Sequence, residues 1–369
     1  MYKPKICLIG PFPPYKGGIS QYNDCLAEEL SNNSELYCIS YKRQYPGFLI
    51  KNRVQKDNSS RTVARSYCVD FLIDSVNPFS YLKSIYRLVR FKPDLVIIPW
   101  WVIYWAPLYL IIFVFLKLFK IKSLAICHNV FEHEDNSIKQ LVSKFVLKFP
   151  DNYIVHSNGE MDKIISFTKN KNIIKHLLPI YDHMIVEEEK YDSVIGSPLR
   201  LLFFGFVRQY KGLDLLLSAV NEMQNDVVLT IAGEFWEGRE EYFKYISDNN
   251  LKNIKIMEGY VSDDLMDQVF RSNDIVVLPY KSATGSAVLS TAYAYSKPVL
   301  VTNVGGLPDA VVNYETGIVV EANQRAIMKG LKFFMEEGSR IDFSNNIKRF
   351  VAENMSWKSL AHEVLSCVK

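Results

Sequence analysis

The sequence contains no C-x-x-C pair and no H-E-x-x-H motif, so the common cysteine and metalloprotease zinc patterns are absent. Its six cysteines are scattered, and several lie inside short apolar runs such as KICLIG and LAICHN. Isolated thiols in apolar surroundings are typical of small buried side chains in a reducing compartment rather than of a disulfide framework. We therefore expect a cytoplasmic protein without disulfides.

An excess of charge of one sign is also missing, since 43 basic and 40 acidic residues leave a net charge of +3. This balance argues against a dedicated nucleic-acid binder. A secretory signal is not expected, because the apolar run Ile6–Ile9 is too short for one. Apolar residues, by contrast, make up 49% of the 369 residues, which is enough for two domains with sizeable cores.

One uncharged segment, Leu95–Leu116, is long enough to cross a bilayer. Pro99 and Pro107 interrupt it, so we expect a buried strand followed by a helix over Pro107–Phe119. With the next strand, SLAICHN, these pieces form a β-α-β unit rather than a spanning helix. Two alternatives stay open for the helix, which is either buried inside its domain or placed at the edge of a bilayer by neighbouring tryptophans and lysines.

Short apolar runs alternate with helical patterns along both halves of the chain, which predicts two doubly wound α/β domains with parallel sheets. The boundary is expected in the acidic, poorly periodic segment Tyr181–Ser197. Helices are predicted between most strands, for example at Gly18–Leu30, Pro78–Phe91 and Ser137–Phe149. The predicted strands are Lys5–Gly10, Glu35–Tyr41, Tyr67–Ile73, Asp94–Pro99, Ser123–His128, Asn152–His156, His176–Pro179, Leu199–Phe206, Val227–Gly233, Ile254–Tyr260, Asp274–Pro279, Pro298–Thr302 and Gly317–Val320.

The most informative segment is Leu201–Leu217, which reads as a strand, a short basic loop and a helix. Arg208 and Lys211 lie in the loop, where α/β folds bind ligands at the carboxyl ends of their strands. A guanidinium fork and a lysine charge suit phosphate oxygens, so a pyrophosphate ligand is the first hypothesis. A solvated basic loop is the alternative.

Other loops also follow predicted strands and carry glycine or polar residues. Gly17 and Gly18 precede the first helix, and Thr284–Ala287 precede a later one, so backbone N–H groups could hold an anion at either place. The pair His128-Asn129 ends another strand and suits sugar hydroxyls or a reacting centre. The alternatives are plain β-α turns, a structural histidine and, with His133, a weakly supported zinc site.

A long loop from Lys42 to Arg65 holds seven basic residues and one acidic residue. Its length is unusual inside a compact domain, which favours a binding role. Arg43, at its start, is a candidate for contact with a bound molecule.

Taken in order, these segments resemble the family-4 retaining glycosyltransferases of the GT-B fold over nearly the whole chain. YKRQYP is similar to a sub-group that builds polysaccharides and lipid-linked glycans. The motifs that carry the resemblance are GPFPPYKGGIS, ICHNVFEHE, GFVRQYKG, IAGE, EGYV, DIVVLPY, KPVLVTNVGGLPDAV and ETGIVV.

The resemblance implies two Rossmann-like domains facing across a cleft. Residues 1–182 would bind the acceptor, residues 183–355 would bind a nucleotide sugar, and a last helix within 356–369 would pack back on the first domain. Transfer would retain the anomeric configuration and need no metal or other cofactor, because cations and helix dipoles neutralise the leaving diphosphate.

The resemblance also implies roles for individual residues. Arg208 and Lys211 would hold the diphosphate and act in catalysis with His128, which would lie near the transferred sugar. The acceptor would contact Arg43 and Asn129. The remaining donor contacts would come from Gly17, Gly18, Gly205, Tyr260, Val261, Thr284, Gly285, Ser286, Ala287 and Thr291.

One departure from the family concerns two glutamates that usually lie eight positions apart. Aligned on KPV, these positions hold Ala283 and Thr291 here, and hydroxyls of Thr291, Ser290 or Ser282 could substitute.

Taken together, the sequence features favour an enzyme that extends a lipid-linked saccharide for a surface polysaccharide, placed peripherally on the inner face of the membrane. A non-catalytic GT-B subunit and a nucleotide-sugar epimerase are the rival hypotheses.

Overall fold

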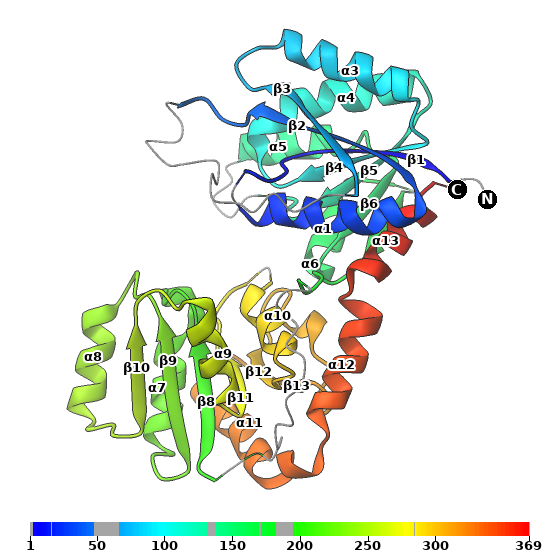
Figure 1. The fold of residues 1–369 in the computed structure, drawn as a ribbon. Coiled ribbons are helices and arrows are strands. Elements are labelled where there is room, and N and C mark those ends of the chain that lie inside the picture. Colours follow the sequence, from blue (N-terminus) through cyan, green and yellow to red (C-terminus); the bar gives the residue numbers. More distant parts are fainter. Residues whose placement is uncertain are drawn as a thin grey trace. The chain divides into compact units, whose positions relative to one another are not determined.

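The computed structural model describes residues 3–15, 17–47, 66–131, 137–169, 171–181, 195, 197–283 and 285–368. The chain divides into two compact units, Met1–His176 with Trp357–Lys369, and Leu177–Ser356. Each unit contains one parallel sheet, which confirms the prediction of two doubly wound α/β halves (Figure 1). Most of the basic loop 42–65 and of the expected linker 181–197 lies outside the described residues, as does His133.

The sheet of the first unit has the order β3-β2-β1-β4-β5-β6-β7. All but one of these strands lie within two residues of the predicted bounds at each end. Their bounds are β1 (Lys5–Ile9), β2 (Glu35–Arg43), β3 (Cys68–Asp74), β4 (Leu95–Trp100), β5 (Lys122–Cys127), β6 (Asn152–Val155) and β7 (Asn172–Lys175).

The seventh strand was predicted wrongly at His176–Pro179, because it is β7 that pairs with β6. The apolar side chains that produced this prediction do not belong to the first sheet. Leu177 and Ile180 are buried in the core of the second unit. A short apolar run therefore marked the boundary between two cores rather than a strand.

Helices α3, α4 and α5 lie on one face of this sheet and α1 lies on the other, as right-handed crossovers require (Figure 1). The C-terminal helix α13 packs against α1. Among the described residues, none of the helices is both long and apolar enough to span a membrane. The helices of this unit are α1 (Gly18–Asn33), α3 (Phe79–Phe91), η1 (Ile103–Trp105), α4 (Ala106–Leu118), α5 (Ser137–Val146), α6 (Asn158–Ile165) and α13 (Trp357–Ser366).

The long uncharged segment forms β4, η1 and α4, which confirms the predicted β-α-β unit. One side of α4 is core, since Tyr109, Ile112, Phe113 and Leu116 are all buried. The Tyr109 hydroxyl lies 2.8 Å from the hydroxyl of Tyr41 in β2, so its polar atom is paired inside the core. The opposite side of α4 is exposed, so the helix is buried along one side only.

The sheet of the second unit has the order β10-β9-β8-β11-β12-β13. Its strands are β8 (Leu199–Phe204), β9 (Val227–Gly233), β10 (Ile254–Glu258), β11 (Ile275–Leu278), β12 (Val299–Thr302) and β13 (Gly317–Val320). Its helices are η3 (Gln209–Lys211), α7 (Leu213–Asn221), α8 (Arg239–Asp248), α9 (Asp263–Arg271), α10 (Ala287–Ala294), η4 (Pro308–Ala310), α11 (Gln324–Glu337), η5 (Gly338–Arg340) and α12 (Phe343–Asn354).

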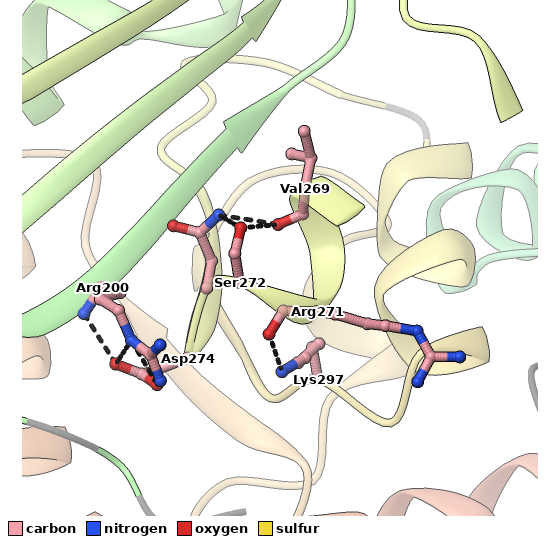
Figure 2. Close-up of polar contacts among 7 residues, drawn as sticks. Arg200, Val269, Arg271, Ser272, Asp274 and Lys297 are labelled. Carbon is pink, nitrogen blue, oxygen red and sulfur yellow. Dashed lines mark hydrogen bonds and ion pairs between the residues drawn. The ribbon is translucent and has the colours of Figure 1, made fainter. Parts of the chain in front are cut away.

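Charged groups join the amino ends of the central strands in this sheet (Figure 2). The buried carboxylate of Asp274, just before β11, accepts hydrogen bonds from Arg200 in β8 at 2.5 Å (Nη2) and 2.8 Å (backbone N). Lys297, before β12, donates to the carbonyl of Arg271 at 3.3 Å, and burial lowers its pKa to about 8. These contacts pair the polar groups at the amino edge of the sheet with one another. The loops at the carboxyl edge form the candidate site.

We expect Phe113→Ala to destabilise the first unit by about 3–5 kcal/mol, because it removes a fully buried ring from the core. Ile111→Ala is the matched control on the same helix, since its side chain is largely exposed. Calorimetric unfolding of the full chain measures both. Equal shifts of the two variants would show that α4 is not packed as described.

Candidate functional site

The strand order of the second unit reverses between β8 and β11, and α/β folds bind ligands at the carboxyl ends of the strands that flank such a switch point. The loops that leave the two strands are joined, since the backbone N–H of Lys281 donates to the Tyr210 carbonyl at 2.7 Å. Gly212 has φ of 67°, and a β-carbon there would lie 1.9 Å from the Pro279 carbonyl oxygen. Only glycine permits this approach, so the basic loop is held closely against the start of the second loop.

Lys211 is a buried cation at this switch point, with 8% of its surface exposed. Its Nζ lies above Gly205, where an added β-carbon would be 3.5 Å away, and 5.5 Å from the ring centre of Tyr280. Burial, and secondarily the charge of Arg208, lower the pKa of Lys211 to about 8. Lys211 forms no ion pair with any described residue. A desolvated ammonium without a carboxylate beside it is suited to bind an anion.

Arg208 lies three residues before Lys211 and is only loosely paired. Its Nε is 3.6 Å from a carboxylate oxygen of Glu237, and its guanidinium lies 5.1 Å from the ring centre of Trp236. The Nε atom is enclosed and has no hydrogen-bond partner among the described residues. Arg208 therefore retains donor capacity for a ligand next to Lys211.

The second loop leads into α10, whose first turn is the other predicted anion contact. Ser286 precedes the helix and its hydroxyl is 3.3 Å from that of Tyr280. Gly285 and Ala287 are exposed, whereas Thr284 lies outside the described residues. A third loop packs closely against this turn, because a β-carbon at Gly305 would lie 1.4 Å from the Ala283 carbonyl oxygen.

The hydroxyls that could replace the family's glutamates differ in their availability. Thr291 is buried and donates from Oγ1 to the Ala287 carbonyl at 3.0 Å, so its hydroxyl hydrogen is used within α10. Ser290 is also buried, whereas Ser282 is exposed. Thr291 keeps only acceptor capacity, and Ser282 is the hydroxyl that is free to reach a ligand.

Tyr260 and Val261 follow β10, which is separated from β8 by β9. Tyr260 is 85% exposed at the same carboxyl edge of the sheet. Gly259 before it has φ of 117°, and its N–H bonds the Gly233 carbonyl at 3.0 Å. The pair is therefore two strands away from the Arg208–Lys211 loop along this edge.

In the first unit, His128 follows β5 and contacts Tyr22 of α1 edge to face, with ring centres 4.6 Å apart. Burial, and then the neighbouring His156, hold the pKa of His128 well below its usual range, so the ring is neutral at pH 7. Its Nε2 is enclosed and has no hydrogen-bond partner among the described residues. Gly17 and Gly18 begin the helix that carries Tyr22, so α1 connects them to His128.

His156, Tyr22 and Trp357 were missed as parts of this aromatic cluster. His156 directly follows β6, at the same edge of the sheet as His128, and this position was the available signal. Its Nδ1 bonds the carbonyl of His176 at 2.8 Å, which fixes the ring. The turn after His128 is fixed from α6, where Glu160 accepts from the Val130 N–H at 2.5 Å.

Arg43 ends β2, and its guanidinium is 3.1 Å from the carboxylate of Asp74. Two strands, β1 and β4, separate β2 from β5, so Arg43 does not lie beside His128 and Asn129. Asn129 is half-buried immediately after His128. Within the described part of the chain, no three His, Cys, Asp or Glu side chains gather as a metal site would require.

Residues 186–352 match the model of the family described as "Glycosyl transferases group 1". An uncharacterised glycosyltransferase of Methanocaldococcus jannaschii is 28% identical over 173 residues, which cover 46% of this chain and 44% of that protein. A D-inositol 3-phosphate glycosyltransferase of Pseudarthrobacter chlorophenolicus is 28% identical over 178 residues, covering 46% and 42%. The chain spans about half the length of the curated relatives it matches.

The structure of Anabaena HepE in complex with UDP is similar over 98% of both chains, with a TM-score of 0.69 and 12% identity. At this identity the similarity concerns the fold, which is GT-B. The family match covers the unit that contains Arg208, Lys211 and the α10 turn.

We expect the affinity for UDP to fall by up to about tenfold between about pH 7 and about pH 9, because Lys211 loses its charge as the pH rises through about 8. Lys211→Arg keeps its charge over this range and should show a flatter profile. Calorimetric titration at several pH values measures both. A parallel pH dependence in wild type and Lys211→Arg would contradict the assignment.

Proposed function

We propose that this chain is a retaining glycosyltransferase of family 4 that takes its sugar from a nucleotide diphosphate sugar. The observation that carries the proposal is the buried Lys211 ammonium beside Arg208 at the switch point, with no carboxylate paired to Lys211 among the described residues. The family match over residues 186–352 and the UDP in the similar structure support this choice of ligand.

In this proposal the protein's main chemical task is to stabilise the leaving diphosphate. Lys211 and Arg208 neutralise its oxygens, and the N–H groups at the start of α10 add hydrogen bonds and the helix dipole. The acceptor hydroxyl attacks the anomeric carbon from the face that the diphosphate leaves. The bond from that carbon to the phosphate oxygen breaks, and the leaving phosphate takes the hydroxyl proton. No metal ion takes part in these steps.

His128 has a separate role in the proposal. Its ring is neutral, and its Nε2 has no hydrogen-bond partner among the described residues. The ring can therefore form a hydrogen bond with a hydroxyl of the transferred sugar without adding charge. Tyr22 and His156 hold the ring in place. Asn129, next in the chain, would contact the acceptor.

For the acceptor we propose a lipid-linked saccharide on the inner face of the membrane, extended for a surface polysaccharide. The basic loop 42–65 and the exposed side of the apolar helix α4 support this choice. A matched relative is named a D-inositol 3-phosphate glycosyltransferase, and D-inositol 3-phosphate is an anion. Arg43 is paired with Asp74, so its acceptor contact would require exchange of that ion pair.

The second candidate is a non-catalytic subunit that binds a nucleotide or a partner protein. Ala283 and Thr291 favour it, because neither supplies the carboxylate that the resemblance predicts and the Thr291 hydroxyl hydrogen is already used. The intact pair of Arg208 and Lys211 favours the enzyme.

We expect Lys211→Ala and Arg208→Ala each to lower turnover by about 10²–10³-fold, as the loss of an oxyanion donor does. Lys281→Ala is the matched control, since Lys281 lies in the adjacent loop but is exposed and paired with Asp214 at 2.7 Å. Transfer is measured with the donor that the binding panel below identifies. Near wild-type turnover in both site variants would remove the diphosphate assignment.

We expect one of UDP-, GDP-, dTDP- or ADP-sugars to raise the melting temperature of the chain, because a ligand of the folded state stabilises it. The Lys211→Ala variant should lose this stabilisation while keeping its own melting transition. Hydrolysis or transfer of the stabilising sugar nucleotide separates the two candidates. Binding without any turnover would favour the non-catalytic subunit, and no stabilisation by any of the four would contradict the donor assignment.

A further inference from the structure

The helices α3, α4 and α5 lie on one face of the first sheet and show an unusual distribution of apolar side chains (Figure 1). More than half of the large apolar side chains that are exposed in the described chain belong to these helices or directly follow them. On α3 they are Phe79, Leu82, Tyr86 and Val89, and on α5 they are Ile138, Leu141, Val142 and Phe145. α4 adds Ile111, Val114 and Leu118, and Phe119 follows it.

The outward residues on α3 and α5 recur at helical spacing, so each helix exposes a continuous apolar stripe. Both helices bury a serine, Ser84 and Ser143, while Phe79 is 78% and Ile138 72% exposed. An amphipathic helix that only supported the core would bury these apolar side chains and expose its serines. We call the outward side chains of α3, α4 and α5 the basic apolar face.

The charges on this face are of one sign. Residues 79–92, 106–120 and 137–149 contain nine basic residues and no acidic one, in a chain whose total charge is nearly balanced. Lys83, Arg87 and Arg90 of α3 are exposed and form no ion pair with described residues. The helix on the other side of the sheet, α1, contains Asp24, Glu28 and Glu29 and no basic residue. The first unit is therefore electrostatically two-sided.

We propose that the basic apolar face docks on an anionic lipid bilayer surface. Apolar side chains would enter the interfacial region while lysines and arginines meet the headgroups, which is the pattern of interfacial amphipathic helices. A second copy of the chain is disfavoured, because a symmetric contact would bring two faces of the same charge together. The sheet orients the acidic α1 side away from the bilayer.

This inference deepens the proposed function and rests on it only for the claim that the acceptor is lipid-linked. The surface itself belongs to the first unit and involves neither Arg208 nor Lys211. Docking is measured without nucleotide sugar or turnover, so its failure and a failure of the donor assignment are separate results.

The test is co-sedimentation of the full chain with phosphatidylcholine vesicles, with and without phosphatidylglycerol. We expect binding to the anionic vesicles only, weakened by salt. Phe79→Ser with Leu82→Ser, and Leu141→Ser with Phe145→Ser, should each lower the partition coefficient at least about tenfold. Arg87→Glu should lower it as well.

Matched controls are Tyr314→Ser with Met335→Ser, which remove exposed apolar side chains of the second unit, and Lys175→Glu, which reverses an exposed charge on β7. These variants should bind like wild type. Sedimentation velocity and circular dichroism report assembly and folding for every variant. The proposal would be overturned if the wild type did not bind anionic vesicles, or if the control variants lost binding to the same extent as the face variants. The proposal would also be overturned if the wild type formed a dimer that did not bind vesicles and that the substitutions in the basic apolar face dissociated.

Discussion

The desolvated ammonium of Lys211 is the feature on which the chemistry of the candidate site depends. Gly212 makes its position possible, because only glycine lets this loop approach the Pro279 carbonyl so closely. Without a bound anion, burial disfavours the charged form and lowers its pKa to about 8. An incoming diphosphate would restore the charge that burial opposes, so binding and protonation would reinforce each other.

The two edges of the second sheet are specialised in different ways. At the amino edge, the charges of Arg200 and Asp274 satisfy each other and hold β8 to β11. At the carboxyl edge, Lys211 has no carboxylate partner in the described chain and Arg208 is only loosely paired with Glu237, and three loops are packed backbone to backbone around these cations. The first unit adds a neutral histidine cluster on one edge and a basic apolar face on one side.

The strands and the Arg208–Lys211 loop could be predicted from sequence because buried parallel strands are continuous apolar runs and their carboxyl ends carry the polar residues. The prediction failed at His176–Pro179, where Leu177 packs in the other unit's core, since an apolar run does not specify which core it joins. The exposed apolar stripes of α3 and α5 were missed for a related reason. Helical periodicity locates an apolar stripe on α3 and α5, but it does not say whether the stripe faces inward. The separation of Arg43 from His128 required the strand order.

The most direct test of the proposed diphosphate site is the pKa of the Lys211 side chain itself, measured by NMR on lysine-labelled protein. In the free protein, Lys211 should titrate near pH 8, well apart from the exposed lysines. Saturation with UDP should raise this pKa, because the bound anion favours the charged ammonium. A Lys211 pKa that stays unchanged while UDP binds would contradict the account.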